Sequence, residues 1–336
     1  MESIIRISES EMKSEFVRIL RNSGFSIDKA DKCSEIFTNN SLEGIYSHGV
    51  NRFPRFIRNT LDGLIKPDAE PILTYSVGAL EQWNGNLGPG PLNAAFATSR
   101  AMTLAAKVGI GLVALANTNH WMRGGTYGWQ AAREGCVFIG WTNTDANMPA
   151  WGAIDARLGN NPLVFGLPYE GEAIVLDFAM TQFSYGKMET YQMEGKDLPY
   201  PGGFNKAGEL TLDPNEILES KRPVPIGFWK GSGLSLMLDI LAAILSGGLA
   251  THEITKSGNE SGLSQVFIAI SIDKLPDIKS VNSSVKRIIS DLKKSENENI
   301  DTSVRYPGES VVKIRNENTR NGIPVNRKIW EKVLSL

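Results

Sequence analysis

Histidine is rare in this chain, and two of its three histidines lie in polar segments next to glycine. His48 lies in the segment YSHGVNRF, and Arg52 follows four residues later, one helical turn further on. A guanidinium can hold a carboxylate through two parallel hydrogen bonds, while an imidazole that titrates near neutral pH can protonate an adjacent oxygen. The pair predicts a site for a 2-oxo acid, although a helix-capping histidine beside a solvated arginine would give the same spacing.

His120 lies in ANTNHWMRGGTYGW, directly after the apolar run GIGLVAL. We expect it on a loop at the end of a strand, where functional groups are often displayed, and the alternative is a histidine that satisfies buried backbone groups. His252, in ATHEITK, is predicted to lie at the surface, because no second histidine completes a HExxH motif. Histidines without suitably spaced Asp or Glu would leave a metal ion under-coordinated, so we expect no metal site.

A candidate anion site lies at Trp229-Lys230-Gly231-Ser232-Gly233, just before a long apolar segment. Free backbone amides and the positive end of a helix would meet there. Asp177 follows the run AIVLDFA and can face the same cleft, although ordinary turn or capping chemistry explains it equally well. The run GIGLVA matches a dinucleotide-binding fingerprint only formally, because it precedes a strand instead of joining a strand to a helix.

Hydrophobic periodicity indicates the elements that position these residues. The first 65 residues repeat apolar side chains at helical spacing, and Gly63 and Pro67 end this helical unit. From about residue 72 the chain changes to short β-rich runs, with helical patterns over 94–107 and 127–134 between them. This alternation favours an α/β fold in which helices cover a sheet.

Three later segments extend the pattern. The stretch 191–224 is rich in Pro, Gly and acidic residues and predicts an extended loop with a functional role. The apolar stretch 234–250 falls short of the roughly 20 apolar residues of a membrane helix, so it predicts a buried core helix. QVFIAISI predicts another strand, and an amphipathic helix is expected over 281–292.

Composition bounds the class of protein. A chain of 336 residues exceeds the usual domain of about 100–200 residues, so two packed units are expected. The net charge is −2, with acidic and basic residues spread along the chain, which argues against nucleic acid as a partner. Cys33 and Cys136 are predicted to be buried thiols, and the N-terminus lacks the pattern of a secretory signal, so a cytoplasmic protein is expected.

Four motifs together resemble the malate/L-lactate dehydrogenase type 2 family: SHGVNRFPRF, NTNHWMRGGTYGWQAA, LDFAMTQFSYG and GFWKGSG. The resemblance covers essentially the whole chain. It implies a homodimer and an α/β fold unlike the Rossmann type, with a mixed, largely antiparallel NAD(P)-binding sheet domain covered by helices. We assign this sheet domain to 72–231 and a mainly helical domain to 1–71 plus 232–336.

The resemblance also implies NAD(P)H-dependent reduction of a 2-oxo acid, with His48 as the proton donor. Arg52 is expected to hold the carboxylate and His120 to orient a hydroxyl or the reacting oxygen, while Asp177 steadies the nicotinamide pocket or a proton relay. NADH is expected in preference to NADPH. The expected cofactor neighbours, which include the YPGESV segment, are Ala173, Ile174, Val175, Leu176, Asp177, Phe178, Ala179, Lys230, Gly231, Glu309, Ser310 and Val311.

The substrate follows less directly. The segment NHWMRGG is typical of the branch of the family that reduces 2,3-diketo-L-gulonate to 3-keto-L-gulonate, whereas the chain reads DFAMT from Asp177 where many relatives read DMATS. Malate, lactate, ureidoglycolate or a cyclic imino acid are alternative substrates on the same scaffold. A nucleotide-binding relative without catalytic activity is the alternative from another class.

Overall fold

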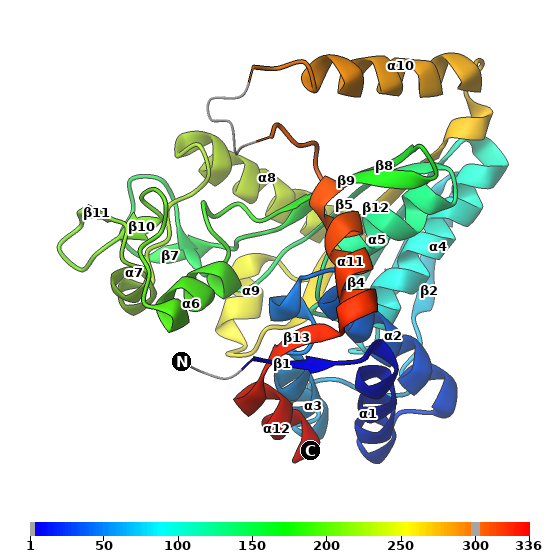
Figure 1. The fold of residues 1–336 in the computed structure, drawn as a ribbon. Helices are drawn as coiled ribbons and strands as arrows, with labels where there is room; N and C mark the ends of the chain where they lie inside the picture. Colours follow the sequence, from blue (N-terminus) through cyan, green and yellow to red (C-terminus); the bar gives the residue numbers. More distant parts are fainter. Residues whose placement is uncertain (1–3, 297–302) are drawn as a thin grey trace.

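The structure is a computed structural model that describes residues 4–296 and 303–336. A twisted sheet forms its centre, helices lie on both sides of the sheet, and a separate group of helices lies below it, next to both termini (Figure 1). The fold is therefore α/β, as the alternating sequence pattern predicted.

The central sheet has seven strands in the order β2-β3-β4-β12-β5-β8-β9. Only β3 and β4 pair in parallel, so the sheet is mixed and largely antiparallel, as expected. The formal fingerprint GIGLVA joins a helix to a strand, because Gly109 is the C-cap of α4. The strands are β2 (Ile72–Val77), β3 (Leu80–Asn84), β4 (Ile110–Asn119), β5 (Cys136–Thr142), β8 (Leu163–Tyr169), β9 (Glu172–Phe178) and β12 (Ser261–Ser271).

Strand β12 lies in the middle of this sheet, between β4 and β5. Its residues belong to the range 232–336, which the sequence analysis assigned to the helical domain. An antiparallel strand needs no crossover helix, so a distant segment can insert between two strands that are already placed. The sheet therefore draws on both sides of the predicted boundary.

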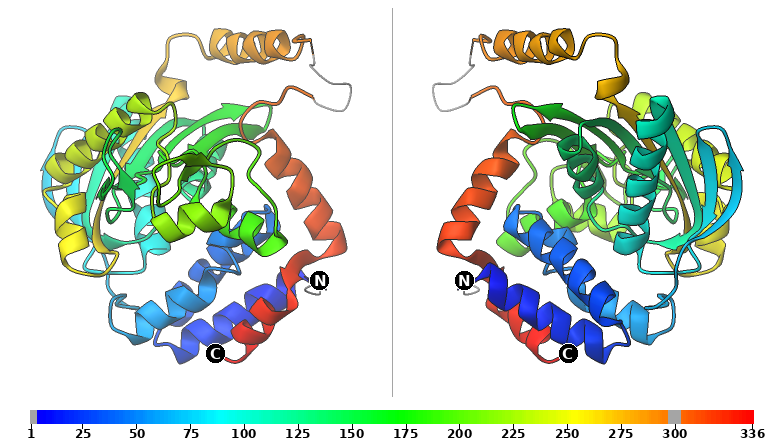
Figure 2. Two further views of the ribbon diagram at one scale, coloured as in Figure 1. Left: turned by 90° about the vertical axis from the view of Figure 1, so that its left-hand side faces the viewer. Right: turned by 90° about the vertical axis from the view of Figure 1, so that its right-hand side faces the viewer.

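Helices cover both faces of the sheet (Figure 2). Helices α4 (Gly90–Val108) and α5 (Gly125–Arg133) pack on one face, and α8 (Trp229–Ser246) packs on the other. Side chains alternate accordingly: Val113 of β4 joins the first core and Ala114 the second. Both helices predicted between the early strands are confirmed.

The sequence predicted a buried core helix over 234–250, but α8 is buried on one side only. Leu238 and Ala242 are buried against the sheet, but Ile244 is 64% exposed on the opposite side. Among the described residues it is the one helix long and apolar enough to cross a membrane by length and composition alone. Its contacts with β12, β4 and β5 instead identify it as a helix that packs on a sheet.

The segment predicted as a loop over 191–224 contains regular structure, so that prediction was wrong in part. Pro and Gly punctuate short elements here instead of excluding them, and Asp213 caps a helix that begins at Pro214. The elements of this outer region are α6 (Tyr185–Glu194), β10 (Gly203–Phe204), β11 (Leu210–Thr211) and α7 (Pro214–Ser220), with β6 (Met148–Pro149), β7 (Ala156–Leu158) and α9 (Thr251–Lys256) nearby.

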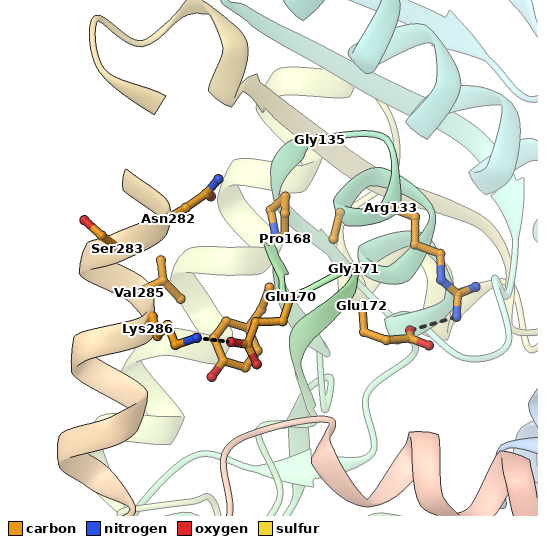
Figure 3. A pocket seen from close by; sticks show the side chains of 12 residues that line it. Arg133, Gly135, Pro168, Glu170, Gly171, Glu172, Asn282, Ser283, Val285 and Lys286 are labelled. Atoms are coloured by element: carbon orange, nitrogen blue, oxygen red, sulfur yellow. Dashed lines mark hydrogen bonds and ion pairs between the residues drawn. The ribbon is translucent and has the colours of Figure 1, made fainter. Parts of the chain in front are cut away.

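Helix α10 (Ile278–Leu292) follows the short helix η2 (Ile272–Lys274) and lies at the rim of the molecule. Its apolar face is largely exposed, since Ile289 is buried but Ile288 is 67% exposed. A shallow groove separates α10 from the turn between β8 and β9, and the ion pair between Lys286 and Glu170, 2.9 Å long, spans it (Figure 3).

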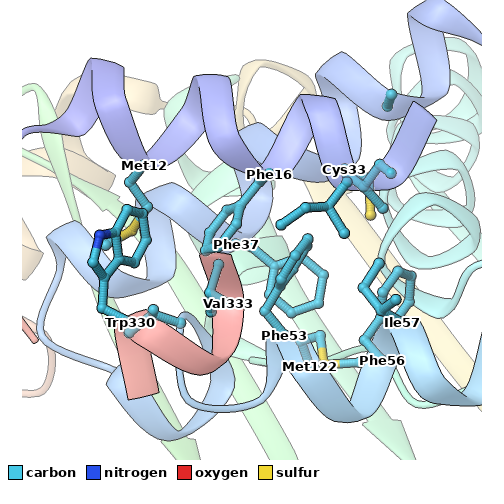
Figure 4. Packing of buried hydrophobic residues seen from close by; sticks show 14 of the residues in the cluster. Met12, Phe16, Cys33, Phe37, Phe53, Phe56, Ile57, Met122, Trp330 and Val333 are labelled. Carbon is cyan, nitrogen blue, oxygen red and sulfur yellow. The ribbon is translucent and has the colours of Figure 1, made fainter. Parts of the chain in front are cut away.

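The group of helices below the sheet has its own core of aromatic side chains (Figure 4). Phe16 stacks on Phe53 with ring centroids 4.0 Å apart, and Cys33 is buried in the same core. Strands β1 and β13 pair antiparallel, which joins the two ends of the chain. The elements are β1 (Ile4–Ile7), α1 (Glu9–Asn22), α2 (Ile27–Leu42), η1 (Tyr46–His48), α3 (Phe53–Leu61), α11 (Glu309–Asn321), β13 (Ile323–Asn326) and α12 (Arg327–Leu334).

Candidate active site

A cavity of about 1470 Å³ lies where the lower helices meet one edge of the sheet. It is larger than the roughly 300–1,000 Å³ that drug-sized ligands occupy, so it has room for a dinucleotide together with a small acid. Its wall combines η1, the loop after β4, the end of β9, one side of α6 and the start of α11. Residues on this wall include Ser47, His48, His120, Met122, Arg123, Thr144, Asn160, Leu176, Asp177, Lys187, Thr190, Pro307, Gly308 and Val311.

His48 and His120 lie side by side on this wall, with their ring centroids 5.8 Å apart and their planes 17° from parallel. The backbone N–H of Met122 donates a hydrogen bond of 2.9 Å to Nδ1 of His120. Nδ1 is therefore an acceptor, which leaves the proton of the neutral ring on Nε2. Ser47 Oγ lies 3.1 Å from Nδ1 of His48 and orients that ring in turn.

The corner that carries His48 is fixed by helix α2. Asn40 Nδ2 donates to the carbonyl oxygen of His48 over 3.0 Å, and Ser41 Oγ accepts from Val50 N over 2.8 Å. Gly49 is required here, because a Cβ at that position would lie 2.2 Å from Ser41 Oγ. The buried polar residues of α2 thus set the position of the imidazole.

Burial favours the neutral form of both imidazoles. Desolvation lowers the pKa of His48 to about 3, and the nearby His120, Arg52 and Arg123 act in the same direction. Desolvation also lowers the pKa of His120 well below its ordinary value, with Arg52 and Arg55 adding to the effect. A bound carboxylate would counter these positive charges and raise the pKa of both rings.

Arg52 is the N-cap of α3 and lies close enough to both histidines to affect their pKa values. Its Nη2 forms an ion pair of 3.3 Å with Glu260, and its side chain is 26% exposed. Arg52 is not among the residues that line the cavity. The sequence spacing placed it near His48 but did not reveal its acidic partner, Glu260.

Asp177 lies at the end of β9 and faces the cavity. Its Oδ2 accepts a hydrogen bond of 2.7 Å from the backbone N–H of Gly125, at the start of α5. Desolvation raises the pKa of Asp177, while Arg123 and this hydrogen bond lower it. The position is consistent with a residue that shapes the pocket beside the histidines.

Arg123 was missed by the sequence argument, although it lies in the NHWMRGG motif. It is buried on the cavity wall and forms an ion pair with Glu43. Glu43 also binds Arg315 of α11 over 2.6 Å, so one carboxylate joins α2, the loop after β4 and α11. Lys187 and Thr190 of α6 were missed as well, because α6 has no strong helical periodicity.

The predicted cofactor neighbours divide into two groups. Val175, Leu176, Asp177, Phe178, Ala179 and Val311 line the cavity. The others lie behind the wall or away from it: Ala173 and Ile174 are buried, Glu309 binds Lys293 over 2.6 Å, Ser310 lies beside Glu309 on α11, and Lys230 and Gly231 lie in the first turn of α8.

The chain matches the family model described as malate/L-lactate dehydrogenase over residues 7–334. The chain belongs to the malate/L-lactate dehydrogenase family. It is therefore an oxidoreductase, and the family implies a nicotinamide cofactor. The largely antiparallel sheet agrees with the absence of a strand-to-helix Rossmann fingerprint in the sequence.

Relatives of this dehydrogenase family support the assignment along the whole chain. The chain is 44% identical to the 2,3-diketo-L-gulonate reductase of Salmonella newport over 333 residues, which cover 99% of this chain and 100% of the relative. The malate dehydrogenase of Entamoeba histolytica superimposes with a TM-score of 0.93 at 26% identity, covering 99% and 98% of the two chains. The delta1-piperideine-2-carboxylate reductase of Pseudomonas syringae pvar. tomato superimposes with a TM-score of 0.86 at 25% identity, covering 98% and 99%.

Proposed function

We propose that this enzyme reduces 2,3-diketo-L-gulonate to 3-keto-L-gulonate with NADH. The observation that carries the proposal is the pair of oriented imidazoles on the wall of a large cavity, with Arg123 on the same wall and Arg52 close enough to lower the pKa of both rings. This arrangement offers a proton, a hydrogen-bond donor and a positive potential to a 2-oxo acid. The choice of this oxo acid rests on the relatives at 44% identity and on the NHWMRGG motif.

The chain's own residues divide the work of carbonyl reduction. Arg52 binds the substrate carboxylate, and His120 donates a hydrogen bond from Nε2 to the carbonyl oxygen. His48 transfers its proton to the same oxygen as negative charge develops there. Asp177 keeps the start of α5 in place through Gly125 N and shapes the floor of the cofactor pocket.

The cavity wall fits a nicotinamide dinucleotide. Gly308 allows the first turn of α11 to approach β9 closely, because a Cβ there would lie 3.1 Å from Val175 N. The positive end of the α11 dipole suits a pyrophosphate, and Val175 to Ala179 line the cavity together with Gly308. When bound, the reduced nicotinamide supplies a hydride to the carbonyl carbon. We propose NADH over NADPH on the motif resemblance alone.

The test measures turnover of a panel of substrates, monitored as the decrease in NADH or NADPH absorbance. We expect the highest kcat/KM with 2,3-diketo-L-gulonate, and lower values with oxaloacetate, pyruvate and delta1-piperideine-2-carboxylate. A preference for another oxo acid or for the imine would keep the reductase and reject this substrate. Nucleotide binding without turnover of any compound would instead identify a relative that lost catalysis.

A homodimer is the assembly we propose, with the exposed side of α8 in the interface. Apolar side chains between 38% and 69% exposed run along this side: Phe228, Trp229, Leu234, Leu236, Met237, Ile240 and Ile244. A contiguous apolar patch of this kind on a folded protein usually marks a protein contact. A second copy can cover it in a self-complementary way.

We expect Ile244→Glu to reduce the molar mass measured by light scattering from twice 36.8 kDa to 36.8 kDa. Ile288→Glu is the matched control, because Ile288 of α10 is 67% exposed but lies off this surface. A monomeric wild type, or a dimer that survives the α8 variant, would contradict the assignment. We also place the enzyme in the cytoplasm, where the free thiols of Cys33 and Cys136 would stay reduced.

A further inference from the structure

Glu260 is the acidic partner of Arg52, although neither motif nor composition singles it out. It immediately precedes β12, whose first residue Ser261 pairs with Asn119 at the end of β4. Ser261 Oγ donates to Asn119 Oδ1 over 2.9 Å, and Asn119 Nδ2 in turn donates to three backbone carbonyl oxygens. This anchored strand end brings the Glu260 carboxylate to Arg52 and Arg55, both of which are close enough to His120 to lower its pKa.

The Glu260 carboxylate contacts two guanidinium groups. Its Oε2 lies 3.3 Å from Nη2 of Arg52 and 3.7 Å from Nη2 of Arg55, and its side chain is only 15% exposed. Asp145 and His120 are the other titratable groups near this cluster, and Glu189 of α6 also acts on Arg52. One enclosed carboxylate therefore balances two like charges that would otherwise repel each other beside the active site.

The fork of Arg52 is only partly used by this contact. Within residues 4–296 and 303–336, Glu260 accepts the one side-chain hydrogen bond that Arg52 donates, and it does so through Nη2. The Nη1 and Nε donors thus remain available for a second anion. A guanidinium held at one edge loses less rotamer freedom when its other edge binds a ligand.

We propose that Glu260 is a positioning residue that holds the Arg52 guanidinium in the orientation in which it binds the substrate carboxylate. The inference rests on the proposed function, in which Arg52 is the carboxylate-binding group. It predicts that Glu260 contributes to the affinity for anionic substrate through Arg52 and does not affect the affinity for NADH.

A merely structural role for Glu260 predicts a different result. In that case the Glu260 contact only joins the start of β12 to α3, and its loss lowers stability without changing carboxylate affinity. A matched ion pair separates the two roles. Glu81 binds Arg100 through both of its oxygens over 2.6 and 2.7 Å and is 2% exposed, but it lies on β3 away from the cavity.

The experiment measures the dissociation constant of oxalate by calorimetry in the presence of NADH, together with KM and kcat for the oxo acid. Oxalate serves as a carboxylate probe that requires no turnover. For Glu260→Gln we expect both the oxalate dissociation constant and KM to rise about ten- to a hundredfold, with kcat changed far less. Glu260→Asp, which keeps the charge, should recover part of the affinity, and Glu81→Gln should leave all three values unchanged.

A double-mutant cycle shows whether Glu260 acts through Arg52. In an Arg52→Ala background, Glu260→Gln should weaken oxalate binding no further. An unchanged oxalate affinity in Glu260→Gln, or two effects that multiply, would overturn the proposal. If Glu260→Gln does not fold, Glu260→Asp carries the same cycle.

The two proposals fail separately. Oxalate binding that depends on Glu260 and Arg52, in an enzyme that reduces no oxo acid, would reject the proposed reaction and keep the positioning role. The positioning role alone would be rejected by a different pair of results. In these, the wild-type enzyme reduces the oxo acid without binding oxalate, and Glu260→Gln leaves KM unchanged.

Discussion

Replacing His48 with Gln is expected to lower kcat for oxo-acid reduction by about a hundred- to ten-thousandfold, the usual contribution of a general acid. Glutamine keeps a polar side chain at the cavity wall. Its amide does not ionise near neutral pH, so it cannot act as a general acid. His120 is poorly suited to take over as the acid, because its Nδ1 already accepts from Met122 N–H and burial keeps its pKa well below the ordinary value, so its ring stays neutral. The loss should therefore persist at all substrate concentrations.

The control for this variant is His252→Gln, which changes the exposed histidine on α9 and should keep wild-type kcat. The dissociation constant of NADH should remain unchanged in His48→Gln, which shows that the cavity still forms. A variant that keeps more than about a tenth of wild-type kcat would remove His48 from the role of proton donor.

The second large effect is a dependence of kcat/KM on pH, which we expect for reduction of the oxo acid but not for the reverse oxidation. Desolvation, His120, Arg52 and Arg123 lower the pKa of His48 to about 3, and the cavity wall also carries Asp177, Lys187, Glu194 and Lys196. Reduction of an oxo acid starts from the enzyme with protonated His48. Above the pKa this fraction falls with each pH unit, so kcat/KM for reduction should fall about tenfold per unit between about pH 5 and 8.

The reverse reaction needs neutral His48, which is already present throughout this range. We therefore expect kcat/KM for oxidation of the 2-hydroxy acid to be independent of pH over the same interval. Because reduction consumes one proton, the ratio of the two kcat/KM values must fall about tenfold per pH unit whatever the pKa of His48. The pKa decides only which direction carries the dependence.

Initial rates in both directions between about pH 5 and 8 test this expectation. An ordinary histidine pKa near 6.5 would give reduction a plateau at low pH and would make oxidation rise until about pH 6.5. Such a break would contradict the shifted pKa and would show that burial does not keep His48 neutral. The same data for His48→Gln should lose the dependence on this group.

The sequence predicted best the helices and strands that have strong local patterns of apolar residues. The helices now seen at α4 and α5 and the β-rich region that begins near residue 72 were predicted, because the side chains that face a core repeat with a fixed period. The formal fingerprint at Gly109 was rejected correctly, because its position before a strand is a local property. The buried thiols of Cys33 and Cys136 followed from their apolar neighbours.

The two histidines illustrate the limit of this reasoning. Each was selected for its local setting, but nothing in the sequence says that His48 and His120 stack on one wall. That contact depends on α2, which fixes the His48 corner, and on Met122, which fixes the ring of His120. Such contacts join residues far apart in sequence, where spacing carries no information.

By itself the sequence therefore determined the fold class and the family motifs, and it selected the candidate catalytic residues. The tertiary structure alone decided their partners: Glu260 for Arg52, Glu43 for Arg123, and the place of β12 within the sheet. It also decided that α8 buries one side and exposes the other. The physical reason is that an apolar pattern records that a face is covered, whereas the identity of the covering surface depends on how all the elements pack together.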